Sequence, residues 1–226
     1  NIRYFKEETE DNEDFSKKLG ALGDIYINDA FSCSHRKQAS VHNITKFVKK
    51  SYAGPLLKRE ITAINLVMEN KKEPVTCIIG GSKISTKINV ITSLLKKVNN
   101  LIIVGAMANN FFVYKNFKVG KSLIEKNTKE IIEDIYKKAE LNNCEILIPE
   151  DCTVGKDFDG SGKNKNLDEI KEDEIILDIG INTIKKIQQK INVSNTVLWN
   201  GPAGYFENDN FSKGTLSIAE NISKNT

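Results

Sequence analysis

Short apolar runs alternate with longer amphipathic stretches along the chain, and this alternation limits the fold more than any other sequence feature. The runs are rich in Val and Ile and are apolar almost throughout, which is typical of strands buried on both faces. They predict strands at residues 24–28, 75–79, 101–104, 145–148, 175–178 and 196–199.

The stretches between these runs predict helices at residues 11–22, 55–70, 82–98, 106–114, 128–141, 183–191 and 210–223. Pro55 falls in the first turn of one of them, where a missing backbone N–H costs nothing. Apolar strands separated by helices predict an α/β fold, in which helices cover both faces of a parallel sheet. Ligands of such sheets bind beyond the carboxyl ends of the strands, so functional residues are sought there.

Charge and apolar content exclude several classes of partner. The 33 basic and 30 acidic side chains leave a net charge of only +3, so neither nucleic acid nor a membrane is an expected partner. The apolar run 101–108 is far shorter than the roughly 18 residues of a membrane span, and no secretory leader opens the sequence. The cysteines are widely spaced and predict reduced thiols in a cytoplasmic protein: Cys33, Cys77, Cys144 and Cys152.

Glycines and lysines follow the predicted strand at 75–79. Gly80 and Gly81 allow a sharp turn, and the predicted helix after them would offer free N–H groups to an anion. Lys83 and Lys87 are four residues apart, so on a helix they would face the same side and could both reach a phosphate. An ordinary turn with two solvated lysines explains this segment equally well.

Other predicted strands also end in glycine-containing turns, around Gly105, Gly180 and Gly201. Together with Gly80 they predict four turns along one edge of one sheet, where a nucleotide could bind. Upstream, Arg3 ends or interrupts an apparent first strand, and Arg36 follows the strand at 24–28. Guanidinium groups suit a carboxylate or a phosphate, although ordinary surface arginines would look the same.

Three motifs follow one another in a specific order. They read Asn28-Asp29-Ala30-Phe31 with His35-Arg36, then Gly80-Gly81-Ser82-Lys83 with Lys87, and then Trp199-Asn200-Gly201-Pro202 with Phe206-Glu207. In this order the motifs resemble the phosphoglycerate kinase family. The opening residues 1–5 are similar to an Asn-Leu-Arg-Phe stretch of that family, and the resemblance covers essentially all 226 residues.

The resemblance implies two Rossmann-like three-layer αβα domains with parallel sheets, of which the first is incomplete in this sequence. The expected division is a phosphoglycerate-binding part at 1–54, a helix and linker at 55–73, and a nucleotide-binding domain at 74–226. The implied reaction is phosphoryl transfer between 1,3-bisphosphoglycerate and ADP, giving 3-phosphoglycerate and ATP, with Mg²⁺ accompanying the nucleotide. Hinge closure would bring the domains together, and a monomer is expected.

The resemblance also implies roles for individual residues. Arg3 and Arg36 would bind the phosphoglycerate, while Lys83 and Lys87 would bind the nucleotide phosphates. Lys83 and Arg3 are also expected to act in catalysis, and no residue is assigned to a metal. Glu207 would take the ribose hydroxyls. The remaining nucleotide-binding positions are Gly105, Asn200 and Gly201.

Parts of the family pattern have no counterpart in the sequence. An Asp-x-Asn segment, an arginine and a His-x-x-Arg motif of the substrate site would precede Asn1, and a Gly-Gly-Gly-Asp/Glu turn would follow Thr226. The usual Gly-Gly-Gly-Met reads Val104-Gly105-Ala106-Met107. Residues 1–226 alone are therefore expected to have little or no kinase activity.

Two alternative functions remain open at this point. The chain could act as a non-catalytic fragment that binds adenine nucleotides. A dinucleotide-dependent oxidoreductase is less favoured, because no Gly-x-Gly-x-x-Gly follows a predicted strand. Binding of ADP rather than NAD would separate the kinase from the oxidoreductase, and turnover would separate it from the fragment.

Overall fold

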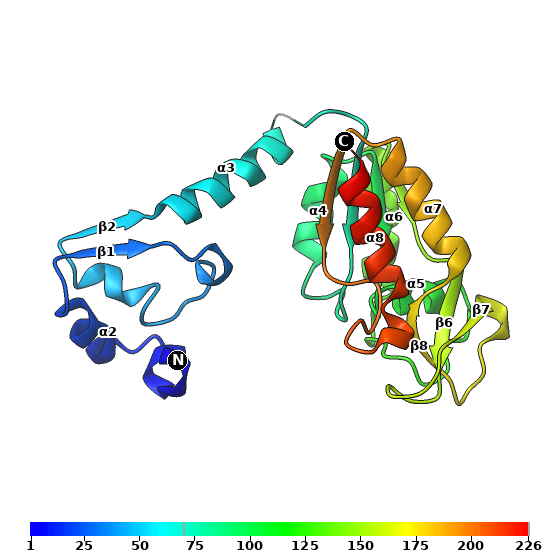
Figure 1. Cartoon of the computed structure of the whole chain (residues 1–226), viewed down its shortest axis with the longest axis horizontal. Helices are drawn as coiled ribbons and strands as arrows, with labels where there is room; N and C mark the ends of the chain where they lie inside the picture. Colours follow the sequence, from blue (N-terminus) through cyan, green and yellow to red (C-terminus); the bar gives the residue numbers. More distant parts are fainter. Residues whose placement is uncertain (70, 226) are drawn as a thin grey trace. The chain divides into compact units, whose positions relative to one another are not determined.

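The computed structural model describes residues 1–69 and 71–225, in two compact units that run from Asn1 to Asn70 and from Lys71 to Thr226 (Figure 1). The predicted end of the helix at 55–70 and the predicted end of the second domain, Asn70 and Thr226, lie outside the described residues. The finer division at 1–54, 55–73 and 74–226 stays a proposal. Among the described residues, no helix is both long enough and apolar enough to cross a membrane.

The first unit is built on two parallel strands, with Ile25 opposite Lys50 and Asn28 opposite Ala53. Arg3 lies in a 3₁₀ turn, so the prediction that it ends a strand was wrong; its backbone N–H donates to the side chain of Asn1. The elements of this unit are η1 (Ile2–Tyr4), α1 (Lys6–Thr9), α2 (Glu13–Gly20), β1 (Ile25–Asn28), η2 (Phe31–Cys33), η3 (Asn43–Lys46), β2 (Lys50–Ala53) and α3 (Pro55–Glu69).

The first motif shapes the chain around β1. The amide of Asn28 accepts from Ala30 N–H at 3.0 Å and donates to the Ser34 hydroxyl at 3.0 Å. The Asp29 carboxylate accepts from Leu57 N–H at 2.9 Å, in the first turn of α3. Because Asp29 satisfies a helix N–H that has no partner within its own helix, the motif connects β1 to α3.

The second unit contains a four-stranded parallel sheet in the order β5-β4-β3-β9. Every residue of the two central strands is buried, as the apolar runs predicted. The strands are β3 (Val75–Ile79), β4 (Asn100–Ile103), β5 (Glu145–Leu147) and β9 (Thr196–Asn200).

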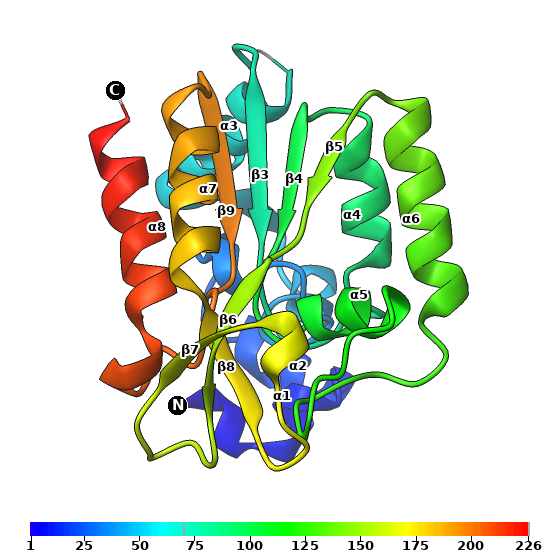
Figure 2. The same ribbon diagram turned by 90° about the vertical axis from the view of Figure 1, so that its right-hand side faces the viewer.

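Helices cover both faces of this sheet, so the unit has three layers and the predicted α/β class is confirmed (Figure 2). On one face, Ile78 and Ile102 pack with Ile187 and Ile191 of α7 and with Ile218 of α8. α4 and α6 lie on the other side of the sheet (Figure 2). The helices are α4 (Ile88–Leu95), α5 (Ala108–Tyr114), α6 (Lys129–Leu141), α7 (Ile181–Asn192) and α8 (Lys213–Lys224).

A second, antiparallel sheet in the order β7-β6-β8 corrects the prediction of a single sheet. Its strands are β6 (Asp151–Gly155), β7 (Lys163–Asn166) and β8 (Ile175–Ile179). The short turn η4 (Leu167–Glu169) lies between β7 and β8, and η5 (Asp209–Phe211) lies between β9 and α8. The turn after β8 therefore does not lie on the edge of the parallel sheet. β7 was missed because its sequence, Lys-Asn-Lys-Asn, has no apolar residue to mark a strand.

The predicted helix at 82–98 was also too long, because α4 begins only at Ile88. The residues before it form a loop in which Ile84 is fully buried and Lys87 occupies the N-cap position. Lys83 and Lys87 therefore do not share a helix face. Instead, the loop is shaped by contacts with a distant part of the chain.

Candidate functional site

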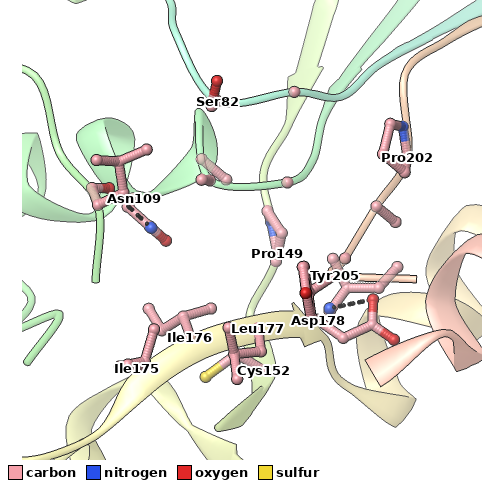
Figure 3. Close-up of a pocket in the computed structure, with 18 of the residues that line it drawn as sticks. Ser82, Asn109, Pro149, Cys152, Ile175, Ile176, Leu177, Asp178, Pro202 and Tyr205 are labelled. Atoms are coloured by element: carbon pink, nitrogen blue, oxygen red, sulfur yellow. Dashed lines mark hydrogen bonds between the residues drawn. The ribbon is translucent and has the colours of Figure 1, made fainter. Parts of the chain in front are cut away.

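A cavity of about 450 Å³ lies in the second unit, beyond the carboxyl ends of β3 and β4 (Figure 3). The turns after these two strands form one wall, and β8 forms the opposite wall. The segment that follows β9 closes one side, and α5 closes another. Its lining includes Gly81, Ser82, Gly105, Ala106, Asn109, Phe112, Leu123, Ile176, Leu177, Asp178, Pro202, Ala203, Tyr205 and Glu207.

Glycines let three turns of the parallel sheet meet backbone against backbone. A Cβ atom on Gly80 would lie 2.0 Å from the carbonyl oxygen of Pro202, far inside contact distance. Gly105 and Gly201 have φ values of +70° and +85°, which side chains disfavour. Gly80 N–H donates to Asn200 O at 2.8 Å and Gly105 N–H to Ala203 O at 3.1 Å, so these turns form one continuous rim.

Lys87 lies on this rim, between the turns that follow β3 and β9. Its ammonium donates to Gly80 O at 2.9 Å and to the side-chain oxygen of Asn200 at 2.7 Å. Partial burial lowers the pKa of Lys87 below its ordinary value. Both hydrogen-bond acceptors are neutral, so they orient the cation without cancelling its charge. Such a group is suited to an anionic ligand at the edge of the cavity.

The loop that carries Lys83 and Lys87 is held by Glu125, from the segment between α5 and α6. The Glu125 carboxylate accepts from Ile84 N–H, from Ser85 N–H at 3.1 Å and from the Ser85 hydroxyl. Desolvation opposes ionisation of Glu125, but these hydrogen bonds and the nearby Lys83 outweigh it and lower the pKa of the carboxyl. Sequence reasoning missed Glu125, since nothing local marks its contact 40 residues away.

Asp178 is a second residue that sequence reasoning passed over. Its carboxyl is buried at the end of β8 and accepts from Gly214 N–H of α8 at 2.7 Å and from Ile179 N–H at 2.8 Å. Burial raises the pKa of Asp178 to about 7, although both N–H groups favour the charged form. Tyr205 N–H donates to the neighbouring carbonyl of Leu177 at 2.7 Å, which ties the segment after β9 to β8.

The structure brings most of the predicted nucleotide-binding residues together. Gly105 and Glu207 line the cavity, and the rim beside it is formed by Lys87, Asn200 and Gly201. Lys83 is exposed on the loop and does not line the cavity. Arg3 and Arg36 belong to the first unit, and both are exposed there.

The apolar wall of the cavity was not predicted. It is formed by Phe112, Leu123, Ile175 and Ile176. Only one sequence feature pointed weakly to this wall: Ile175 and Ile176 belong to a predicted strand that ends near the expected site. Buried polar residues of α5 carried no such signal, because they look like ordinary helix residues in the sequence.

Comparison with known proteins gives one consistent family. The family model for phosphoglycerate kinase matches residues 1–226. A phosphoglycerate kinase from Wolbachia pipientis wMel is 42% identical over 224 residues, which is 99% of this chain and 56% of the relative. One from Bartonella bacilliformis is 42% identical over 221 residues, covering 97% of this chain and 55% of the relative. The chain thus spans somewhat more than half the length of these curated relatives.

Solved structures give the same result. The structure of phosphoglycerate kinase from Coxiella burnetii has a TM-score of 0.81 and 36% identity, and the match covers all of this chain and 59% of that one. The enzyme from Pyrococcus horikoshii has a TM-score of 0.77 at 25% identity, with the same coverage. Because the family model spans the whole sequence and the relatives agree with it, this chain belongs to the phosphoglycerate kinase family.

Proposed function

We propose that this chain is the nucleotide-binding part, with a portion of the substrate-binding part, of a glycolytic phosphoglycerate kinase. The reaction is reversible phosphoryl transfer between 1,3-bisphosphoglycerate and ADP, giving 3-phosphoglycerate and ATP. The observation that carries the proposal is the cavity with Lys87 at its glycine-rich rim and an apolar wall within it. A nucleotide needs an apolar surface for its base and a cationic surface for its phosphates, and this cavity offers both. A volume of about 450 Å³ is suitable for a ligand of that size.

The nucleotide is proposed to lie with its phosphates at the rim and its base against the apolar wall. Lys87 would bind the phosphates, together with backbone groups of Gly105 and Gly201 and the side chain of Asn200. Glu207 is exposed at the edge of the cavity, where its carboxylate could accept from the ribose hydroxyls. A planar base would be held mainly by the apolar side chains.

The transfer step needs positioning and positive charge more than covalent chemistry. Lys83 is the proposed catalytic cation of the second unit, since its exposed loop position leaves the ammonium accessible to the transferred group. Arg3 and Arg36 would bind the phosphoglycerate, and Arg3 would also stabilise charge during transfer. No general base is required, because the acceptor is already a carboxylate.

Mg²⁺ is proposed to enter as part of the nucleotide substrate. Within residues 1–69 and 71–225, no three His, Cys, Asp or Glu side chains come together as a metal site. Mg²⁺ commonly keeps several waters and binds through substrate phosphates with one or two carboxylates. The donors on this chain fit that mode better than a permanent metal site.

Calorimetric titration of the chain with MgADP tests the proposal, with NAD as the competing ligand. We expect selective ADP binding that Lys87→Ala and Glu207→Ala each weaken by about tenfold, the effect of losing one charged contact of roughly 1.4 kcal/mol. Matched controls are Lys126→Ala and Glu220→Ala, which remove exposed charges that do not line the cavity. Tighter binding of NAD than of ADP would refute the kinase in favour of an oxidoreductase.

A coupled assay with 3-phosphoglycerate and MgATP tests catalysis by the chain itself. Little or no turnover by residues 1–226 remains our prediction, and full turnover would contradict it. Nucleotide binding without turnover would fit the alternative of a non-catalytic adenine-nucleotide-binding chain. The cytoplasmic location and the monomeric state also stay predictions; gel filtration with light scattering tests the second.

A further inference from the structure

One turn of the glycine-rich rim, the turn that follows β9, is held by a side chain outside the cavity. Ala203 is buried in this turn, and its N–H donates to the side-chain oxygen of Thr215 at 3.0 Å. Thr215 belongs to the first turn of α8. Pro202, the residue before Ala203, has no N–H of its own. Because a buried N–H needs an acceptor, the Thr215 hydroxyl fixes where the backbone of this turn lies.

Thr215 is itself held in a defined place. The carboxyl of Asp178 accepts from the N–H of Gly214, the residue before Thr215, at 2.7 Å. A Cβ atom on Gly204 or on Gly214 would lie only 2.4 or 2.3 Å from Asp178 Oδ1, so both backbones pack directly against this carboxyl. The first turn of α8 is therefore connected to β8 through Asp178 and to the turn after β9 through Thr215.

The turn held by Thr215 supports other parts of the rim. The carbonyl oxygen of Ala203 accepts from Gly105 N–H at 3.1 Å, which joins it to the turn after β4. Two residues before Ala203, the carbonyl oxygen of Gly201 accepts from the indole N–H of Trp199 at 2.7 Å. Gly105 and Gly201 are the backbone positions proposed for the nucleotide phosphates. A displacement of Ala203 would therefore disturb both of them.

We propose that Thr215 is a positioning residue for nucleotide binding, which holds the phosphate-binding rim in place through Ala203 without lining the cavity. This inference rests on the proposed nucleotide site and adds a residue outside it. The hydroxyl oxygen carries the effect, so a valine at this position should lose it and a serine should keep it. Loss of the oxygen leaves a buried N–H without its acceptor and frees the turn to move.

Trp199 allows a test without any ligand, because it is the single tryptophan of the sequence and is half-buried beside the rim. Thr215→Val should shift its fluorescence to longer wavelengths, since a loosened turn exposes the indole to water. Thr215→Ser should keep the wild-type spectrum. The matched control is Thr76→Val, whose lost hydroxyl contacts Ser194 at 2.7 Å toward the amino end of β3. The control should be less stable than wild type, with an unchanged spectrum.

Titration with MgADP measures the effect on binding. Thr215→Val should bind ADP about tenfold more weakly than the wild-type chain, the effect of losing one well-placed contact at the rim. Thr215→Ser and Thr76→Val should stay within about twofold of wild type. Thr215→Ala, which also lacks the oxygen, replaces Thr215→Val if that variant does not fold, and the same outcomes apply to it.

The outcomes separate this inference from the proposed function. An unchanged Trp199 spectrum in Thr215→Val, or ADP binding as tight as in Thr76→Val, would overturn the role of Thr215 and leave the nucleotide site intact. A serine variant that behaves like the valine variant would also overturn it, because the oxygen would then not matter. Failure of the folded wild-type chain to bind ADP would refute the nucleotide site and, with it, the use of Thr215, whatever the spectra show.

Discussion

Replacing Glu125 by alanine should loosen the loop that carries Lys83 and Lys87. The substitution removes the acceptor of two backbone N–H groups, from Ile84 and Ser85, and of the Ser85 hydroxyl. Hydrogen bonds to a charged group contribute roughly 1.5–3 kcal/mol each when they are well shielded. Glu125 is only half-buried, so water can replace part of each bond. We therefore expect a loss of about 2 kcal/mol of unfolding free energy in total.

This loss corresponds to a fall in Tm of about 4–8 °C for a unit of this size, measured by circular dichroism. Glu125→Gln should lose less, because the amide oxygen still accepts. If the loosened loop weakens the contact between Lys87 and the nucleotide by about 1 kcal/mol, affinity for ADP should also fall about fivefold. Glu220→Ala, an exposed glutamate of the same unit, is the control.

The pH dependence of the Glu125→Ala effect gives an independent check. Since folding lowers the pKa of Glu125 below its ordinary value of 4.5, its contribution is complete above that value and is lost as the pH falls through the folded pKa. The Tm difference between wild type and Glu125→Ala should therefore shrink at low pH. A Glu125→Ala variant as stable as Glu220→Ala at neutral pH would refute the argument that this carboxylate holds the loop.

Two further substitutions test the packing around the cavity. Because burial raises the pKa of Asp178 from 3.8 to about 7, wild-type stability should fall as pH rises between these values, by at most roughly 4 kcal/mol. Asp178→Asn should remove this pH dependence of the unfolding free energy, measured by urea denaturation. An unchanged pH dependence would show that Asp178 is not its source. Gly80→Ala should destabilise the second unit by about 3 kcal/mol, since the new Cβ would lie 2.0 Å from Pro202 O. Gly23→Ala, whose Cβ would have 3.8 Å of clearance, should be nearly neutral in the same thermal melt.

Local sequence predicted the parallel sheet of the second unit well. β3 and β4 are apolar except for Thr76 and Asn100, and every residue in them is buried. Burial of both faces selects for apolar residues within each strand itself, so the local sequence is enough to predict it. The glycine turns after β3, β4 and β9 were also predicted correctly, because the close backbone approach at Gly80 and the positive φ at Gly105 disfavour other residues at those positions. The order of the motifs then gave the family, and the expected rim of the site followed from it.

The errors arose where an element depends on partners far away in the chain. β8 looked like another parallel strand, yet its pairing with β6 places it in a separate antiparallel sheet. The helix predicted at 82–98 begins only at Ile88 in the structure. Glu125, forty residues away, accepts from the N–H groups of Ile84 and Ser85, which therefore lie in a loop before the helix. The residues around β8 and around Ile84 contain no local pattern that identifies β6 or Glu125 as their partners.

The sequence by itself therefore determined the family, the layered sheet and the glycine-rich rim. Only the tertiary structure decided how the site is assembled: that Lys87 is oriented by Asn200 at a separation of 113 residues, and that Phe112, Leu123 and Ile176 together line one cavity. The physical reason is that burial and backbone conformation are imposed on each residue locally. Hydrogen-bond partners and desolvation are instead set by whichever distant segments the fold brings into contact.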